Sequence, residues 1–158
     1  MTPFEGTVDE VPAEETYALR AAVLRPDGGE ITWAGDEDTS TFHLAARTPD
    51  GTVAGVVRFS PAACPWRADA RAPWQLRGMA TDPAVRGGGA GRALLADGLA
   101  RVAARGGDLV WCDARVPAAG FYERHGFTVV TGPYDKPGIG PHVGMLIDVS
   151  PPDASRSS

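Results

Sequence analysis

The stretch Arg86-Gly87-Gly88-Gly89-Ala90-Gly91-Arg92 decides the fold of this 158-residue chain, because it separates a strand pattern from a helix pattern. Residues 76–81 predict a strand that Asp82-Pro83 ends, and residues 90–105 predict an amphipathic helix. In a glycine-rich loop at a helix N-terminus, backbone N–H groups can point at a ligand, and the helix dipole and the flanking arginines favour negative charge. The stretch therefore predicts a pyrophosphate site, with an ordinary turn as the alternative.

Two common nucleotide-binding patterns do not fit this loop. No Gly-Lys-Ser/Thr follows the last glycine, as it does in the phosphate-binding loop of nucleotide hydrolases. A dinucleotide fingerprint needs spaced glycines in an early βαβ unit and an acidic residue about 20 positions later. Asp108 lies near that distance, but it precedes the next predicted strand instead of ending it. The identity of the ligand therefore has to come from other motifs.

The composition indicates one domain and excludes several classes of partner. We place a single domain at residues 1–149 and a flexible tail at residues 150–158. Fifteen Lys and Arg residues against twenty Asp and Glu residues give a net charge of −5, without a basic stripe for nucleic acid. The first residues lack the pattern of a signal peptide, and no apolar run approaches membrane-spanning length. We therefore expect a cytoplasmic protein, monomeric or homodimeric, without a nucleic-acid or membrane partner.

The two cysteines are expected to be free thiols. Cys64 lies in a Pro-rich segment and Cys112 in an apolar strand, and no metal-ligand spacing joins them. Neither sequence neighbour of Cys112 offers a base or a positive charge that would favour a thiolate. A buried core position is therefore expected for Cys112. We expect no metal site.

Apolar periodicity and turn residues divide the chain into alternating elements. Helices are predicted over residues 12–25, 90–105 and 117–124, and strands over residues 41–47, 52–59, 74–81, 109–112, 127–130 and 143–149. Pro49-Asp50-Gly51 predicts a hairpin turn, and the apolar run 109–112 suits a central strand buried on both faces. With one more strand ahead of the first helix, the order is β-α-β-β-β-α-β-α-β-β. This order is typical of an α/β domain with a mixed central sheet of about six to seven strands and flanking helices.

A second motif, downstream of the glycine-rich loop, supports a family resemblance. Residues 119–127 read Ala-Gly-Phe-Tyr-Glu-Arg-His-Gly-Phe. This segment is similar to the Phe-Tyr-x-x-x-Gly-Phe segment of the GCN5-related N-acetyltransferase (GNAT) superfamily. Residues 86–91 are similar to the Arg/Gln-x-x-Gly-x-Gly/Ala coenzyme A loop of the same superfamily. Because both motifs stand at the expected separation, the chain resembles the superfamily over nearly its whole length.

Further segments resemble a little-characterised branch of this superfamily. They are Val-Leu-Arg-Pro at 23–26, Leu-Arg-Gly-Met-Ala at 76–80, Trp-Cys-Asp-Ala-Arg at 111–115 and Gly-Pro-His at 140–142. That branch tends to have Asn where this chain has Asp113. The resemblance to the branch names no substrate.

The resemblance implies acetyl-CoA as the cofactor. Backbone N–H groups of residues 87–92 would hold its pyrophosphate, with added charge from Arg86 and Arg92. The exposed edge of residues 79–81 would pair with the pantetheine amides as an added strand would. The predicted coenzyme-binding residues are Met79, Ala80, Thr81, Arg86, Gly87, Gly88, Gly89, Ala90, Gly91 and Arg92.

Tyr122 is the implied general acid, because the family places a tyrosine there beside the coenzyme sulfur. The alternative for Tyr122 is a packed aromatic with a satisfied hydroxyl. The general base is open, since no glutamate occupies the fourth strand, where many relatives carry one. His43, His142 and Asp113 are the candidates, because a neutral imidazole can accept a proton near pH 7. Each of the three could instead be structural, or the acceptor could lose its proton to water.

Three arginines, Arg25, Arg77 and Arg115, could face an anionic acceptor, and we add Asp113 to this predicted acceptor site. Salt bridges to the many acidic residues are the alternative. The predicted function is therefore transfer of an acetyl group from acetyl-CoA to a small or amino-acid-like amine by direct attack in a ternary complex. Two alternatives are acetylation of a protein amine and a non-catalytic module that binds or senses acyl-CoA.

Overall fold

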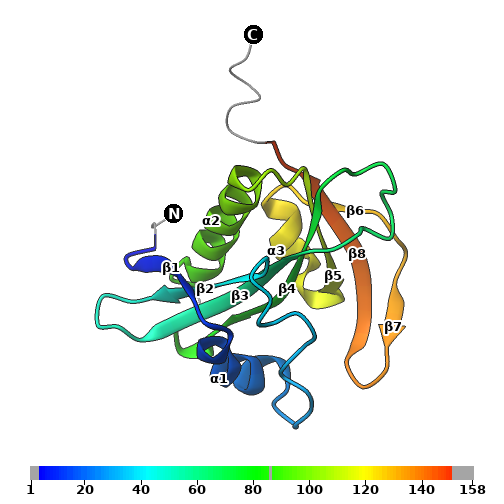
Figure 1. Ribbon diagram of the computed structural model, residues 1–158. Helices are drawn as coiled ribbons and strands as arrows, with labels where there is room; N and C mark the ends of the chain where they lie inside the picture. Colours follow the sequence, from blue (N-terminus) through cyan, green and yellow to red (C-terminus); the bar gives the residue numbers. More distant parts are fainter. Residues whose placement is uncertain (1–3, 86, 151–158) are drawn as a thin grey trace. The chain divides into compact units, whose positions relative to one another are not determined.

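The computed structural model describes residues 4–85 and 87–150, so that Arg86 and all of the predicted tail except Ser150 lie outside the described residues (Figure 1). The chain divides into two compact units. Unit 1 consists of Met1–Ser60 and Leu76–Ala100, and unit 2 consists of Pro61–Gln75 and Arg101–Ser158. The strands and helices together form a mixed α/β fold, as predicted. The single domain over residues 1–149 stays a prediction.

Unit 1 has the strand order β1-β2-β3-β4, and the last residue of β3 and the first three of β4 belong to unit 2. These strands are β1 (Thr7–Val11), β2 (Phe42–Arg47), β3 (Val53–Pro61) and β4 (Pro73–Thr81). β2 is antiparallel to both β1 and β3. The predicted hairpin is confirmed, because the Thr48 amide donates to the Thr52 carbonyl at 2.9 Å and Gly51 supplies the positive φ of 89° that the turn needs.

Helix α2 (Ala90–Ala104) packs on the sheet of unit 1, as the amphipathic pattern predicts. Gly98 approaches β3 so closely that a Cβ at this position would lie 2.2 Å from the Phe59 ring. Fully buried side chains from β2, β3 and α2 form the core of this unit: Leu44, Val56, Val57, Phe59, Leu94 and Leu95. The glycine therefore sets the distance between helix and sheet.

The predicted helix over residues 12–25 is wound in three ways. A 3-10 turn at Ala13–Thr16 leads into one α-helical turn, α1 (Tyr17–Leu19), and then into a π-helical turn at Arg20–Leu24, closed by the Arg25 amide donating to the Arg20 carbonyl at 3.2 Å. A regular helix was expected, and the wider last turn is a correction to that expectation. The winding accompanies the burial of Arg20, which is 1% exposed. Such π turns are frequent at functional sites.

Unit 2 has the strand order β4-β5-β8-β6, and β7 pairs with β8. Its elements are β5 (Leu109–Arg115), α3 (Ala119–Arg124), β6 (Thr128–Val129), β7 (Tyr134–Lys136) and β8 (Gly140–Asp148). The start of β4 runs parallel to β5, and β8 runs antiparallel to β5 along its whole length. The run 109–112 is buried, which confirms the predicted central strand. Strand β7 was not predicted, because three residues in a Gly/Pro-rich segment show no periodicity, and it brings the sheet to eight strands.

Both cysteines, Cys64 and Cys112, are free, as expected, and both are buried, which was expected for Cys112 alone. Burial raises the pKa of the Cys112 thiol far above its ordinary value, and the charge of Asp113 adds to this rise. Cys112 is therefore a core residue and not a nucleophile. Within the described ranges 4–85 and 87–150, every helix is too short or too polar to cross a membrane.

Candidate functional site

The glycine-rich loop of unit 1 has the backbone shape that its sequence predicts. Gly87 and Gly89 both have a φ of 90°, which residues with a side chain rarely adopt. The Ala93 amide donates to the Gly89 carbonyl at 2.9 Å, so Gly89 lies at the N-cap of α2. The backbone amides in the first turn of a helix have no acceptor within the helix. The Gly88 amide donates to the Val85 carbonyl at 3.2 Å. Because the Gly88 amide is already bonded, the amides in the first turn of α2 are the donors that this loop can offer a ligand.

A cavity of about 210 Å³ lies beside this loop in unit 1. Its lining residues are Phe4, Glu5, Thr48, Pro49, Ala54, Val85 and Gly88. Among the lining residues that the structure describes, Glu5 is the one that carries a charge. Because a carboxylate repels a phosphate, the cavity suits a neutral group better than a second anion.

The predicted pantetheine edge consists of Met79, Ala80 and Thr81 at the end of β4. Ala80 is buried at 1% exposure, and the other two residues are partly buried. The pairing of β4 with β5 covers Pro73 to Gln75 only. Residues 79–81 therefore lie beyond the stretch of β4 that is paired in parallel with β5.

Tyr122 lies on α3 of unit 2, where it is 6% exposed and packs edge-on against Phe121 and Phe127. Burial raises the pKa of its phenol well above the ordinary value, so the group keeps its proton at neutral pH. Its hydroxyl makes no hydrogen bond to any residue in the described part of the chain. Tyr122 is thus a buried phenol that keeps its proton and donates it to no residue that the structure describes.

Polar side chains on three paired strands of unit 2 form what we call the polar row: Asp113 and Arg115 on β5, Tyr134 and Lys136 on β7, and His142 on β8. In strand register, His142 lies opposite both Arg115 and Tyr134, so these three share a face. The Tyr134 hydroxyl donates to Asp113 Oδ1 at 2.5 Å, and Lys136 Nζ lies 3.1 Å from Asp113 Oδ2. Burial, together with the hydrogen bond to Asp113, raises the pKa of Tyr134.

His142 has one ring nitrogen engaged and one available. Its Nδ1 lies 2.8 Å from the Gly140 carbonyl oxygen, which can only accept, so Nδ1 carries the proton of the neutral ring. The ring stacks against Tyr134, with centroids 6.3 Å apart. Nε2 has no hydrogen-bond partner in the described part of the chain. The lone pair on Nε2 is the one with which His142 could accept a proton.

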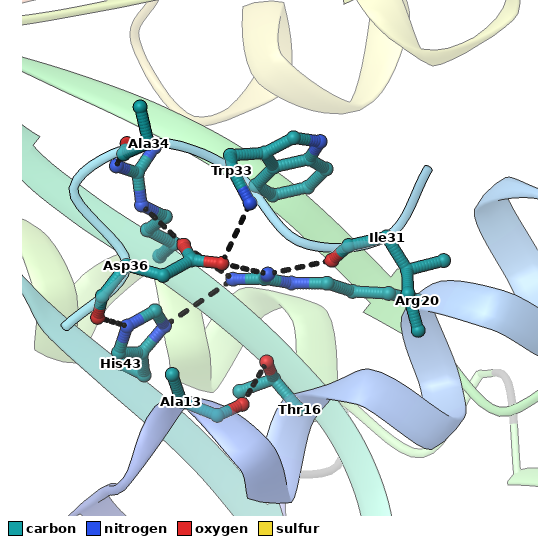
Figure 2. Close-up of polar contacts among 9 residues, drawn as sticks. Ala13, Thr16, Arg20, Ile31, Trp33, Ala34, Asp36 and His43 are labelled. Atoms are coloured by element: carbon teal, nitrogen blue, oxygen red, sulfur yellow. Dashed lines mark hydrogen bonds and ion pairs between the residues drawn. The ribbon is translucent and has the colours of Figure 1, made fainter. Parts of the chain in front are cut away.

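The ion cluster of unit 1 consists of Arg20, Asp36, His43 and Arg58. Figure 2 labels the first three of these residues. Arg20 Nη1 and Arg58 Nε each lie 2.9 Å from a carboxylate oxygen of Asp36. The Trp33 amide donates to Asp36 Oδ2 at 2.9 Å. Burial acts to raise the pKa of Asp36, but the hydrogen bonds from Arg20 and Trp33 and the charge of Arg58 outweigh it, so the pKa lies below its ordinary value.

His43 is fully engaged inside this cluster. Its Nε2 lies 2.8 Å from the Asp36 carbonyl oxygen and donates to it, and its Nδ1 accepts from Arg20 Nη2 at 3.3 Å. Burial lowers the pKa of His43, and the charge of Arg20 contributes to this decrease. Both nitrogens of the neutral ring are therefore occupied, so His43 has no lone pair to offer an acceptor amine.

Trp33 joins this cluster to β4. The guanidinium carbons of Arg20 and Arg77 lie over its ring, 4.1 Å and 4.0 Å from the ring centroid. Gly78 has a φ of 72°, and a Cβ there would lie 2.8 Å from the Trp33 ring and 3.4 Å from Arg20 Nε. Arg20 Nε itself has no hydrogen bond within the described residues, because the ring and the glycine pack against it. Glycine at 78 therefore lets the tryptophan lie on the strand.

The sequence found some of these residues and missed others. It named Arg77 and His43 but missed Arg20, Asp36 and Arg58, which hold them in place. Trp33 and Asp36 stand in residues 25–41, which belong to no helix or strand, so no periodicity marked them. The one available signal was Arg20 among apolar residues of the first helical segment.

Comparison with known proteins agrees with this fold. The model of the acetyltransferase (GNAT) family matches residues 8–127. The chain belongs to the GNAT family. It is 35% identical over 140 residues to YitI of Bacillus subtilis (strain 168), which is named an uncharacterized N-acetyltransferase, and the match covers 87% of this chain and 93% of YitI. Membership of this family makes the chain an acyltransferase of the N-acetyltransferase type.

Solved structures share the GNAT fold. A protein from Lactobacillus plantarum, provisionally named an N-acetyltransferase, has a TM-score of 0.74 at 25% identity, over 91% of this chain and 98% of that one. An aminoglycoside 6'-N-acetyltransferase complexed with coenzyme A has a TM-score of 0.71 at 16% identity, over 92% of this chain and 98% of that one. The second likeness is one of fold alone.

Proposed function

We propose that this GNAT chain transfers the acetyl group of acetyl-CoA to the amine of a small or amino-acid-like acceptor, by direct attack in a ternary complex in the cytoplasm. The observation that carries the proposal is the hydroxyl of buried Tyr122, which has no hydrogen-bond partner among the described residues. A departing thiolate needs a proton, and a phenol whose pKa is raised by burial still carries its proton at neutral pH. Acetyl-CoA would supply the acyl group as a thioester.

The glycine-rich loop is proposed to bind the pyrophosphate of the coenzyme. Its support is the pair of positive-φ glycines, Gly87 and Gly89, ahead of the first-turn amides of α2. The aminoglycoside 6'-N-acetyltransferase that shares the fold is complexed with coenzyme A, which agrees with this assignment. The residues present thus fit the coenzyme.

The loop is tested by substituting one glycine and a matched control. Gly87 and Gly106 have φ values of 90° and 86°, nothing would contact a Cβ at either position, and they flank opposite ends of α2. Gly87→Ala and Gly106→Ala should therefore carry similar strain, about 1–2 kcal/mol. Calorimetry should show about a tenfold loss of acetyl-CoA affinity for Gly87→Ala alone. Equal affinities in the two variants would remove the loop from the proposal.

Tyr122 is tested by removing its hydroxyl. Tyr122→Phe should keep its affinity for acetyl-CoA and lower turnover by about 10- to 10³-fold, because the phenylalanine packs in the same place but donates no proton. Steady-state kinetics and calorimetry on the same preparation separate the two effects. Unchanged turnover would leave Tyr122 as a packed aromatic.

His142 is the base that we propose, ahead of His43. The Nε2 lone pair of His142 has no partner in the described chain, whereas both ring nitrogens of His43 are engaged. His142→Asn keeps a side-chain N–H for the Gly140 carbonyl and loses the basic nitrogen. It should lower turnover by about 10²-fold at neutral pH. A rate like that of the wild type would show that water takes the proton.

The absence of a glutamate from β4 favours one rival, a module that binds acyl-CoA without transferring the acyl group. That rival predicts calorimetric binding of acetyl-CoA with no free thiol released across a broad panel of amines. A second rival, acetylation of a protein amine, predicts a silent small-molecule panel and a labelled protein. Release of coenzyme A with a small amine supports the proposal against both.

A further inference from the structure

The ion cluster of unit 1 and the arginine stacked beside it carry more positive than negative charge. Arg20, Arg58 and Arg77 bring three positive charges, Asp36 brings one negative charge, and Asp38, whose charge acts on Arg58, brings a second. The hydrogen bonds of His43 fit its neutral form, so one positive charge is in excess. Arg20 and Arg58 are 1% and 4% exposed, so water screens them little. A surplus of desolvated positive charge favours the approach of an anion.

The single negative charge of Asp36 does not balance the arginines, and both of its carboxylate oxygens already have partners. Oδ1 pairs with Arg58, and Oδ2 accepts from Arg20 and from the Trp33 amide. The Asp36 amide donates back to the Trp33 carbonyl at 3.1 Å, which fixes the loop that carries both residues. The carboxylate therefore organises Arg20, Arg58 and Trp33, and within the described residues no hydrogen bond or ion pair joins it to Arg77.

Arg77 is the guanidinium left without an anion. It is partly buried on β4, and its contact with the chain is the stack on Trp33 at 4.0 Å. It makes no hydrogen bond or ion pair with any residue of 4–85 or 87–150. Desolvation lowers the pKa of Arg77, and the charges of Arg58, Arg20 and Arg25 lower it further, with Asp36 opposing them. Its five N–H donors are positioned by stacking and have no acceptor among the described residues.

We propose that Arg77, held flat against Trp33, binds a carboxylate of the acceptor, so that the acceptor is an amine that also carries a carboxylate, such as an amino acid. This inference rests on the proposed acyl transfer and narrows its substrate class. A carboxylate matches the planar fork of a guanidinium through two parallel hydrogen bonds, which a single neutral oxygen cannot make. Arg25, whose Nη1 donates to the Leu24 carbonyl at 2.9 Å, adds long-range attraction.

The kinetic test uses pairs of acceptors that differ in the carboxylate alone: an amino acid and the amine left after its decarboxylation. The wild type should prefer the amino acid by about 10- to 100-fold in kcat/KM, the range of a hydrogen bond to a charged group. Arg77→Gln should abolish the preference, and Arg77→Lys should keep only part of it, because an ammonium keeps the charge but not the fork. Arg47→Gln, which removes an exposed pair with Glu15, is the control and should keep the preference.

A binding test without coenzyme separates this inference from the proposed function. Calorimetry with succinate as the probe should give saturable heat with the wild type and with Arg47→Gln, and none with Arg77→Gln. Denaturation profiles of the variants that match the wild type exclude misfolding. If Arg77→Gln does not fold, Arg77→Lys replaces it in the binding test. Equal transfer to both members of every acceptor pair overturns the carboxylate site and leaves the acyltransferase standing. Arg77-dependent succinate binding with no transfer to any amine supports the site and overturns the proposed reaction.

Discussion

The ion cluster of unit 1 and the polar row of unit 2 both place a carboxylate among cationic or phenolic partners, but they differ in exposure. The Asp36 side chain is 5% exposed between two guanidinium groups that are themselves buried. The Asp113 side chain is 20% exposed, and its partner Lys136 is 40% exposed. The same residue type is thus enclosed in one unit and open to solvent in the other.

Because of this difference, we expect the ion cluster and the polar row to have different roles. In the ion cluster every oxygen of the carboxylate and both nitrogens of His43 are engaged, so the cluster can position Trp33 and Arg77 but cannot accept a proton from an amine. In the polar row, His142 Nε2 is left with an available lone pair in the described part of the chain. We expect the first set to support binding and the second to take part in proton transfer.

The largest expected effect comes from neutralising the two carboxylates in turn. Asp36→Asn should lower the free energy of unfolding by about 3–5 kcal/mol, because it leaves two buried guanidiniums without their counter-charge. Asp113→Asn should cost about 1 kcal/mol, because solvent screens the charge of Lys136. Urea unfolding of both variants measures the difference. Equal losses would mean that the two carboxylates are equally enclosed and would end the comparison.

The next largest effect is expected where Trp33 of the ion-cluster region packs on β4. Gly78→Ala places a methyl group 2.8 Å from the Trp33 ring at a backbone φ of 72°, so both a clash and strain oppose it. We expect a loss of about 2–3 kcal/mol in unfolding free energy. Gly138→Ala, in the turn between β7 and β8 at a φ of 78° with open space around it, is the matched control and should cost about 1 kcal/mol. A smaller loss at position 78 than at position 138 would show that Trp33 does not depend on Gly78.

Local patterns were sufficient for much of the fold. Helix α2, the central strand β5 and the hairpin after β2 each follow from residues adjacent in sequence: a helical apolar stripe, a run of four apolar residues, and Pro49-Asp50-Gly51. Strand β7 has three residues and forms only because Tyr134 lies opposite His142 on β8. Such an element depends on its partner strand, and its own composition does not encode it.

The candidate site shows the same limit more clearly. Arg77 could be named from the sequence as an unassigned positive charge, but its role depends on Trp33, which is 44 positions earlier in the numbering, in a segment without periodicity. The burial of Arg20 likewise depends on Asp36, 16 residues later. Because long-range ion pairing leaves no repeated pattern in sequence, residues of the site can be named from the sequence while their partners cannot.

The pH dependence of stability gives a smaller effect that also distinguishes the two regions. Burial lowers the pKa of His43, so the unfolded chain takes up a proton near the ordinary pKa of about 6.5 before the folded chain does. The contribution of His43 is therefore complete above that pH and is lost as the pH falls through the folded pKa. Urea unfolding at about pH 7.5 and at about pH 5.5 should show lower stability at the acidic value. The difference should shrink in His43→Asn and persist in His125→Asn.

The smallest expected effect is at the open end of the polar row. Lys136→Met removes the ammonium 3.1 Å from Asp113 Oδ2, but the lysine side chain is 40% exposed, and an exposed pair contributes between about 0 and 1 kcal/mol. The Tyr134 hydroxyl still donates to Asp113, so the carboxylate keeps a partner. We therefore expect a change of about 0.5 kcal/mol or less in unfolding free energy, smaller still at high salt, because salt screens exposed charges. A loss above about 2 kcal/mol that does not respond to salt would place Asp113 in an environment as closed as that of Asp36.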